Sequence, residues 1–278
     1  MARIVRFVHA QTGPSPRYGV LEDDGHVVVI EPHPFTRFQP SGERVPLEGL
    51  HLLAPVIPSK IVCVGKNYRD HAAEMGGDVP EEPLFFLKPS SSVVGPGEPI
   101  RIPTDLTDEV HHEAEVAVVI GKLLQRVTPE QAIDGILGYT AANDVTARDL
   151  QRRESQWFRG KGFDTFCPLG PAIATGLDAG DLRVRCYVDD ELRQDGTTAD
   201  LVFGIADLVA EVSQVVTLLP SDVLLTGTPA GVGPLAPGQR VRVEVDGIGV
   251  LDNPVVDRQA GGTGGGATGP RSNGHDDA

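Results

Sequence analysis

The chain has 278 residues, 40% of them hydrophobic, which is enough to bury a sizeable core in one large domain or in a small and a larger one. Acidic residues outnumber basic residues by 39 to 24, and the net charge of −15 argues against nucleic acid and anionic membrane surfaces as partners. The three cysteines are far apart and include no CxxC pair, which excludes a disulfide framework and a zinc knuckle.

The composition favours a β-rich, mixed α+β protein, because 33 glycines and 23 prolines with few aromatic residues are typical of many short strands and turns. The amino terminus has no apolar stretch long enough for a signal peptide, and no segment reaches the ~18 apolar residues of a membrane span. We therefore expect a cytoplasmic protein without a membrane segment.

Residues 1–57 are predicted to form a small β domain followed by a linker. Two β-rich runs, 17–22 and 26–31, flank Asp23-Asp24-Gly25, which is a turn signal for a hairpin. The stretch 32–58 that follows is dotted with prolines and predicts the linker.

A larger domain is predicted over residues 58–257. It begins with the apolar run 60–65, which predicts a buried strand, and short β-branched runs predict the further strands 110–120, 184–188, 223–226 and 241–245. The tail 258–278 is rich in glycine and has too little apolar surface to offset its ordering entropy, so we expect it to be disordered.

Two helices are well marked in this domain. Thr128-Pro129-Glu130-Gln131 supplies an N-cap, a proline at the first helical position and a capping-box glutamine. The second helix is predicted over about 205–216, where apolar residues recur on one face. Both are expected to be packing elements.

A pair of acidic residues suggests a metal site. Strand periodicity in 110–120 places Glu113 and Glu115 on one face, about 7 Å apart. Such a pair alone is more typical of a solvated strand edge, but Asp144 ends another expected strand, 138–144. Three carboxylates without cysteine suit a hard cation such as Mg²⁺ or Mn²⁺, which keeps water positions that a bidentate substrate can replace.

Donor side chains follow Asp144 along the chain. Arg148 and Gln151 share a helical face at spacing i, i+3, and Lys161 is predicted on a loop flanked by glycines that lets the backbone approach a ligand. Taken singly, each residue is more typical of an exposed surface position.

A candidate acid–base pair lies upstream of the acidic residues. His71 and Glu74 are three residues apart on a short predicted helix that ends at Gly76-Gly77, so the carboxylate can orient the imidazole as a general base. The loop 226–233 follows a strand, and its backbone N–H groups can cradle a carboxylate. This loop lacks the GK[ST] ending of a phosphate-binding loop.

Ordered motifs across about residues 60–254 resemble the fumarylacetoacetate hydrolase superfamily, in its short bacterial and acylpyruvase-like branch. They are GKNYRDHAAEM, PLFFLKPSSSVVGPG, HHEAEVAVVIGK, NDVTARDLQ, GKGFDTFCPLGP, DELRQ and LLTGTPAGVGP. The resemblance implies a mixed β-roll with a small N-terminal β domain, a homodimer, and a small 2-oxo acid as substrate.

The resemblance also implies roles for individual residues. Glu113, Glu115 and Asp144 correspond to the ligands of Mg²⁺, with Mn²⁺ as an alternative, and His71 and Glu74 to a water-activating pair on a lid.

Four further positions carry over in the same way. Arg148, Gln151 and the catalytic Lys161 correspond to groups that bind substrate oxygens and a developing oxyanion, and Thr228 to a contact with the substrate carboxylate. The segment 152–160 is shorter than in the mitochondrial acylpyruvases, which leaves the identity of the substrate open.

The activity expected from these residues is hydrolysis of a carbon–carbon bond in an acylpyruvate-type 2,4-dioxo acid. Oxaloacetate decarboxylation and the isomerisation or decarboxylation of a 2-hydroxyhepta-2,4-diene-1,7-dioate are alternatives, because each places negative charge on the same oxygen. A catalytically silent metal-binding scaffold predicts no turnover at all, and a metal-dependent nuclease is disfavoured by the charge of −15.

Overall fold

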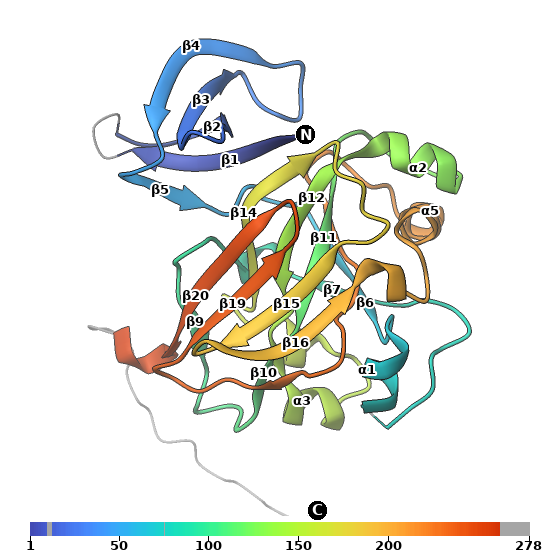
Figure 1. The fold of residues 1–278 in the computed structure, drawn as a ribbon. Coiled ribbons are helices and arrows are strands. Elements are labelled where there is room, and N and C mark those ends of the chain that lie inside the picture. Colours follow the sequence, from blue (N-terminus) through green and yellow to red (C-terminus); the bar gives the residue numbers. More distant parts are fainter. Residues whose placement is uncertain (10–12, 75, 262–278) are drawn as a thin grey trace, which may run out of the picture.

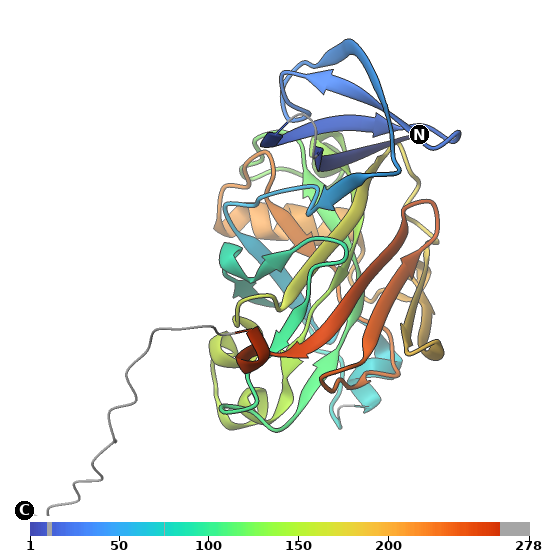
Figure 2. The same ribbon diagram turned by 90° about the vertical axis from the view of Figure 1, so that its left-hand side faces the viewer.

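The computed structural model describes residues 1–9, 13–74 and 76–261. Figures 1 and 2 show an N-terminal β unit at one end of a larger roll of strands, with short helices on the outside of the roll. Over the described residues the chain is rich in strands, which confirms the predicted mixed α+β, β-rich class.

One large sheet runs through both the N-terminal unit and the roll. Its path is β4-β3-β2-β1-β14-β12-β11-β17-β6-β7, with β5 paired to β1 and β8 paired to β14. The bounds are β1 Ala2–His9, β2 Gly13–Leu21, β3 His26–Glu31, β4 Gln39–Pro46, β5 Leu50–Leu53, β6 Ile61–Gly65, β7 Leu84–Lys88, β8 Val93–Val94, β11 Ala114–Ile120, β12 Ile136–Asn143, β14 Cys167–Thr175 and β17 Val223–Leu225.

Two smaller sheets complete the roll. The first has the order β13-β10-β18 and the second the order β16-β15-β19-β20-β9. Their bounds are β9 Ile100–Ile102, β10 Val110–His112, β13 Thr146–Ala147, β15 Arg183–Val188, β16 Glu191–Thr197, β18 Gly233–Pro234, β19 Arg240–Val245 and β20 Gly249–Asp257.

The N-terminal unit is joined to the roll by backbone hydrogen bonds. Strand β1 pairs antiparallel with β14, with Ala2 opposite Thr175 and Ile4 opposite Ile173. The predicted hairpin is confirmed, since β2 pairs antiparallel with β3. The predicted linker is wrong in part, because β4 and β5 lie within it. Strand β4 is almost wholly exposed and polar, so it has no apolar alternation by which the sequence could have revealed it.

The helices are short, and the two that the sequence marks most clearly are confirmed. Helix α2 begins with the predicted capping box, in which the Thr128 hydroxyl accepts from the Gln131 backbone and the Gln131 side chain accepts from the Thr128 backbone. Helices α2 and α5 lie side by side on one flank of the roll (Figure 1). The bounds are α1 Arg69–Glu74, α2 Pro129–Gly135, α3 Arg148–Arg153, α4 Phe158–Lys161 and α5 Ile205–Val215, with 3-10 turns at Ser90–Ser92, Thr198–Asp200 and Arg258–Gly261.

The predicted disordered tail begins where the last of these turns forms. Residues 258–261 make the 3-10 turn, and the rest of that prediction, 262–278, lies outside the described residues. Across the described part of the chain, every helix is too short or too polar to cross a membrane.

Candidate active site

Glu113 lies where the chain passes from one sheet to another. Strand β10 ends at His112 in the three-stranded sheet, and β11 begins at Ala114 in the large sheet. The Glu113 N–H donates to Asn143 Oδ1 at 3.0 Å, and its carbonyl accepts from the Asp144 N–H at 2.8 Å. The strand predicted over 110–120 is therefore two strands, and hydrogen bonds to the end of β12 fix the turn between them.

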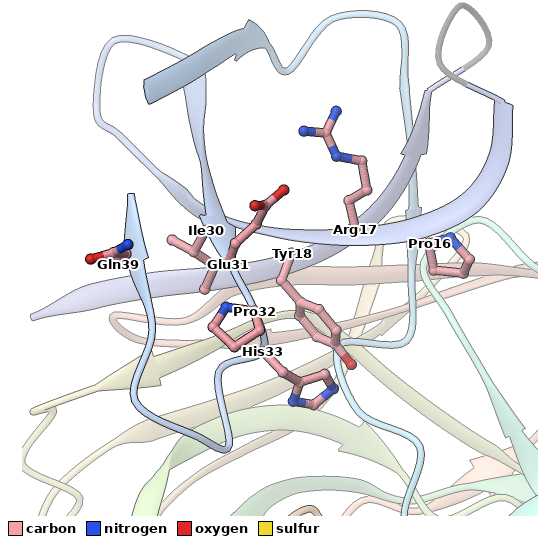
Figure 3. A pocket seen from close by; sticks show the side chains of 8 residues that line it. All are labelled: Pro16, Arg17, Tyr18, Ile30, Glu31, Pro32, His33 and Gln39. Atoms are coloured by element: carbon pink, nitrogen blue, oxygen red, sulfur yellow. The ribbon is translucent and has the colours of Figure 1, made fainter. Parts of the chain in front are cut away.

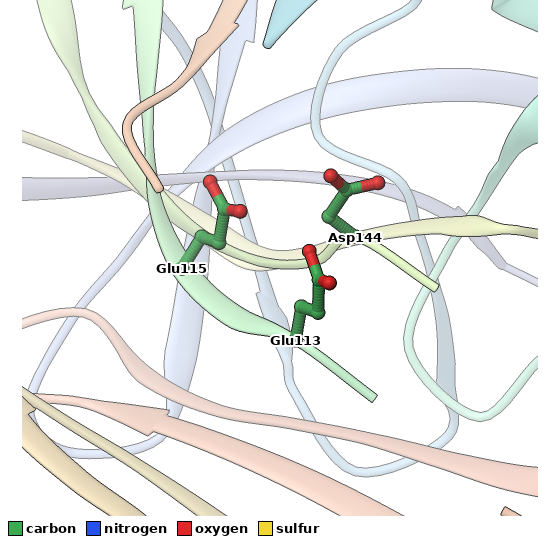
Figure 4. Close-up of side chains that lie close together, drawn as sticks. All are labelled: Glu113, Glu115 and Asp144. Atoms are coloured by element: carbon green, nitrogen blue, oxygen red, sulfur yellow. The ribbon is translucent and has the colours of Figure 1, made fainter. Parts of the chain in front are cut away.

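Three carboxylates converge at this junction. Glu113, Glu115 and Asp144 each offer an oxygen within 4.8 Å of the others (Figure 4), and their exposed fractions are 4%, 1% and 1%. Asp144 reaches the pair because Ala114 is the strand partner of Asn143. The alternative of a solvated strand edge is wrong, since β11 is buried along its whole length between β12 and β17.

Three buried cationic side chains contact these carboxylates. Lys161 Nζ donates to Glu113 Oε2 at 2.8 Å and to Asp144 Oδ2 at 2.6 Å. Lys88 Nζ donates to Asp144 Oδ1 at 2.6 Å, and Arg148 Nη2 donates to Glu113 Oε1. Buried charges require such partners, and here three cations face three carboxylates.

The two glutamates differ in how far neighbouring charges offset the effect of burial on their pKa values. Burial tends to raise the pKa of Glu113, but Lys161 and Arg148 hold that pKa well below its usual range. Burial raises the pKa of Glu115 far above its usual range, and the nearby Asp144 and Glu113 charges raise it further. The Gly227 N–H donates to Glu115 Oε2 at 2.7 Å but does not offset these effects.

The donor set fits a hard divalent cation. The three residues offer only carboxylate oxygens, which are the ligands that Mg²⁺ and Mn²⁺ prefer. The like charge that raises the pKa of Glu115 is a cost that a bound cation would remove. Glu113, Glu115 and Asp144 can therefore hold such an ion.

The predicted donors on α3 and α4 meet at this cluster. Arg148 Nη1 donates to Gln151 Oε1 at 2.7 Å, so these two side chains contact each other as their i, i+3 spacing predicts. The predicted loop position of Lys161 is wrong, because Lys161 is the last residue of α4. Gly160 serves helix packing, since a Cβ atom there would lie 3.0 Å from the Gln151 backbone nitrogen.

His71 and Glu74 form a pair on α1. His71 is buried, and its Nδ1 lies 3.2 Å from Glu74 Oε2. Because an ionised carboxylate only accepts, we assign the proton to Nδ1, which leaves Nε2 as the basic nitrogen. The Gly231 N–H donates to both Glu74 oxygens, at 3.1 and 3.2 Å. Charge on His71 also lowers the pKa of Glu113.

The Thr228 hydroxyl is engaged within the protein. It donates to the Ala114 carbonyl at 2.8 Å and accepts from Gln194 Nε2 at 2.7 Å. The hydroxyl has one proton, and the Ala114 carbonyl, which lies between Glu113 and Glu115 in the chain, accepts it. Contact between Thr228 and a substrate carboxylate stays a prediction.

Sequence reasoning missed Lys88 and Trp157. Lys88 is 2% exposed at the end of β7, whereas lysine is rarely buried without a partner, so its residue type gives no sign of this position. Trp157 packs edge-on against Phe86 with ring centroids 5.3 Å apart, and Lys161 Nζ lies 4.9 Å from the centre of the same Phe86 ring. An aromatic pair thus adjoins the lysine that contacts the carboxylates.

A surface hollow of about 560 Å³ lies elsewhere, on the N-terminal unit (Figure 3). Tyr18 and His33 stack edge to face within it, and Arg17 on its rim is paired with Glu43. None of the predicted site residues lines this hollow, so it is separate from the carboxylate cluster.

The fold and the site define a β-roll enzyme scaffold with a buried three-carboxylate cluster. Residues 60–256 match the family described as fumarylacetoacetate (FAA) hydrolase C-terminal, and residues 2–55 match the family described as Rv2993c-like, N-terminal. The chain belongs to the fumarylacetoacetate hydrolase superfamily, as its motifs indicated.

Named relatives resemble the chain over most of its length. Protein Rv2993c of Mycobacterium tuberculosis is 49% identical over 82% of this chain and 86% of its own, and the mitochondrial oxaloacetate tautomerase fahd2 of Xenopus laevis is 42% identical over 91% and 90%. The crystal structure of 5-carboxymethyl-2-hydroxymuconate delta-isomerase from Mycobacterium smegmatis is 46% identical, with a TM-score of 0.85 over 92% of this chain and 99% of its own. Maleylpyruvate hydrolase from a Sphingobium species, solved with manganese(II) and pyruvate, is 32% identical, with a TM-score of 0.75 over 92% and 99%.

Proposed function

We propose that the chain is a divalent-metal-dependent enzyme that transfers a proton at the carbon next to the 2-oxo group of a small 2-oxo acid. The reaction interconverts the keto and enol forms or shifts a double bond. The observation that carries this proposal is the pair of His71 and Glu74, in which the imidazole is buried and its charge lowers the pKa of Glu113 in the three-carboxylate cluster. Oxaloacetate is the first substrate to test, because the Xenopus relative, 42% identical, is named an oxaloacetate tautomerase.

Glu113, Glu115 and Asp144 would hold Mg²⁺ or Mn²⁺ in this enzyme. When bound, the ion would polarise the 2-oxo group and make the proton on the adjacent carbon more acidic. The manganese(II) ion and pyruvate in the maleylpyruvate hydrolase support this choice of metal and ligand class.

His71 supplies the base. Its Nε2 takes the proton from the carbon, the C–H electron pair passes into the enolate, and Glu74 stabilises the imidazolium that forms. The imidazolium then gives this proton to the enolate oxygen, which completes the conversion of the keto form to the enol form. The reverse direction uses the same two side chains.

Cationic and amide donors would stabilise the charge on the substrate oxygens. Burial tends to lower the pKa of Lys161, but Asp144 and Glu113 raise that pKa above its usual value, so Lys161 stays charged. Arg148 is held beside the cluster by Glu113 and Gln151. Each well-placed donor of this kind is worth about 3 kcal/mol of barrier.

Carbon–carbon hydrolysis of an acylpyruvate is the second candidate, and the same pair favours it. His71 Nε2 would take a proton from water, and the hydroxide would attack the distal carbonyl. The carbon–carbon bond would break to release a carboxylic acid and the pyruvate enolate, and the imidazolium would give its proton to the enolate carbon to form pyruvate. Of the relatives named above, those at 42% and 46% identity are a tautomerase and an isomerase, and the hydrolase is 32% identical. We therefore place proton transfer first.

A panel of substrates separates these activities. Enol-oxaloacetate, acetylpyruvate, fumarylpyruvate and a 2-hydroxy-dienedioate are each assayed with Mg²⁺, with Mn²⁺ and with a chelator, following the enol absorbance and released pyruvate in parallel. We expect chelator-sensitive loss of the oxaloacetate enol without pyruvate. Pyruvate from acetylpyruvate would favour hydrolysis, and pyruvate from oxaloacetate would favour decarboxylation. Absence of chelator-sensitive turnover of every compound contradicts the proposal.

A further inference from the structure

Gln194 is a buried amide in an otherwise accessible strand. In β16 every other residue is at least partly exposed, whereas the Gln194 side chain has no exposed surface. Arg193 is an extra residue in the pairing of β16 with β15, because Cys186 lies opposite Gln194 and Tyr187 lies opposite Leu192. Such a bulge re-aims the side chains beside it, and here it turns Gln194 inward.

The Gln194 amide uses its full hydrogen-bonding capacity. Its Oε1 accepts from His112 Nδ1 at 2.9 Å and from the Ala114 N–H at 3.0 Å. Its Nε2 donates to the Thr228 hydroxyl at 2.7 Å and to the Pro229 carbonyl at 2.8 Å. Two acceptor positions and two N–H groups are all that a glutamine side chain offers.

The two backbone partners fix which end of the amide is oxygen. The Ala114 N–H can only donate and the Pro229 carbonyl can only accept, so the amide cannot be reversed. His112 must then donate from Nδ1 to Gln194 Oε1. Thr228, which accepts from Gln194, must donate its own proton to the Ala114 carbonyl.

Two of these partners flank Glu113 in the chain. His112 and Ala114 are the neighbours of Glu113 in the chain, and Ala114 also precedes Glu115. One side chain therefore fixes the peptide between the two glutamates.

The loop 226–233 rests directly on β16 at the same place. A Cβ atom at Gly231 would lie 2.1 Å from the Arg193 carbonyl oxygen, and one at Gly196 would lie 2.5 Å from Pro229 Cβ. Only residues without side chains allow this approach. The loop in turn donates the Gly227 N–H to Glu115 and the Gly231 N–H to Glu74.

We propose that Gln194 is a positioning residue that sets the distance between the Glu113–Glu115 segment and the loop 226–233. This inference rests on the proposed function, since it assigns Gln194 to the support of that site. Groups that orient metal ligands without touching the metal change metal affinity by about 10- to 100-fold when they are removed. Gln194 would act in this way through Ala114 and Thr228.

The test compares Gln194→Met, which removes all four hydrogen bonds, with a matched buried amide elsewhere. Asn253 in β20 is buried and donates from Nδ2 to the Gly95 and Glu98 carbonyls, both at 2.8 Å. Affinity for Mn²⁺ is measured by calorimetry on the protein without substrate, together with the temperature of unfolding. We expect Gln194→Met to weaken Mn²⁺ binding by about 10- to 100-fold, whereas Asn253→Leu lowers the unfolding temperature and keeps the wild-type affinity.

If Gln194→Met folds and binds Mn²⁺ as tightly as the wild type does, the proposal is overturned. If that variant does not fold, Gln194→Glu decides, because its oxygens still accept from His112 and Ala114 while the donors to Thr228 and Pro229 are lost. Wild-type affinity in Gln194→Glu is then the overturning result, and weaker affinity supports the proposal. A wild-type protein that binds Mn²⁺ but turns over no 2-oxo acid contradicts only the proposed function.

Discussion

Lys88 Nζ lies 2.6 Å from Asp144 Oδ1, and both side chains are at most 2% exposed. Lys161 Nζ also contacts Asp144, so loss of Lys88 removes one of two cationic partners of that buried carboxylate, at a cost of up to about 3–5 kcal/mol. We therefore expect Lys88→Met to lower the free energy of unfolding in urea by that amount. Lys122 is exposed, so Lys122→Met should change the free energy of unfolding by less than ~0.5 kcal/mol. Equal effects of the two substitutions would contradict a buried ion pair.

Glu115→Gln should separate folding from metal binding. The glutamine side chain can still accept the hydrogen bond from the Gly227 N–H. The substitution removes the negative charge that burial and the neighbouring carboxylates disfavour. Without divalent ions we expect the unfolding temperature to be retained or raised. Added Mn²⁺ should stabilise the wild type, because a ligand that binds only the folded state raises its stability, and should stabilise the variant far less.

The control for this experiment is Glu211→Gln, on the exposed face of α5. It should respond to Mn²⁺ as the wild type does. If Glu115→Gln gains as much stability from Mn²⁺ as the wild type, Glu115 is not a ligand.

His71→Gln should abolish proton transfer and spare metal binding. Removing a general base costs about 10²- to 10⁴-fold in rate, and the side chain of His71 contacts Glu74 rather than the three carboxylates. The measurements are kcat on the substrate that the wild type turns over and Mn²⁺ affinity by calorimetry. His51 is exposed on β5, and His51→Gln should retain wild-type kcat. Unchanged kcat in His71→Gln would remove the base from the proposed reaction.

Gly65→Ala should disturb the site through Trp157. A Cβ atom at Gly65 would lie 2.9 Å from Cζ3 of the Trp157 ring, and Trp157 leads directly into α4, which carries Lys161. A displacement of about 1 Å in a catalytic group can cost up to about 10²-fold, so we expect kcat/KM to fall by about 10- to 100-fold. Adding Trp157→Phe, which shortens the ring, should restore part of the loss. If kcat/KM of the double variant stays as low as that of Gly65→Ala, the contact with Trp157 is not the cause of the loss.

The three cysteines should be unreactive in the folded protein. Burial raises the pKa of Cys167 to about 12 and the pKa values of Cys63 and Cys186 well above their usual range, and all three side chains are buried. The thiolate is the reactive form, so a thiol reagent at about pH 8 should modify none of them before unfolding and all three in denaturant. Rapid modification of a thiol in the native protein would contradict the burial.

Much of the roll could be predicted because local signals and packing agree there. The capping box at Thr128 and the apolar face of 205–216 each specify a helix by themselves, and both helices form. The pattern Glu113-Ala114-Glu115 indicated two carboxylates in one space, and the third was found because Asp144 ends a strand that pairs with β11. The structure leaves the catalytic roles of these residues as predictions.

The features that could not be predicted from the sequence depend on contacts between segments that are far apart in the chain. The partners of Gln194 lie 34 and 35 residues away in one direction and 80 and 82 in the other, so no local pattern reveals their hydrogen bonds. The glycines beside Lys161 predict a loop with backbone freedom, whereas in the structure Gly160 allows α4 to pack against Gln151. The edge strand β4 is specified by pairing with β3 rather than by its own composition.

The pairing of β1 with β14 bears on any shortened form of this chain. A version that begins at residue 58 would keep the carboxylate cluster but would uncover the edge of β14 from Ile173 to Thr175. An uncovered edge offers unpaired N–H and C=O groups to another molecule, and such edges promote intermolecular aggregation. We therefore expect the shortened form to self-associate more readily than the full chain, in which β1 covers this edge.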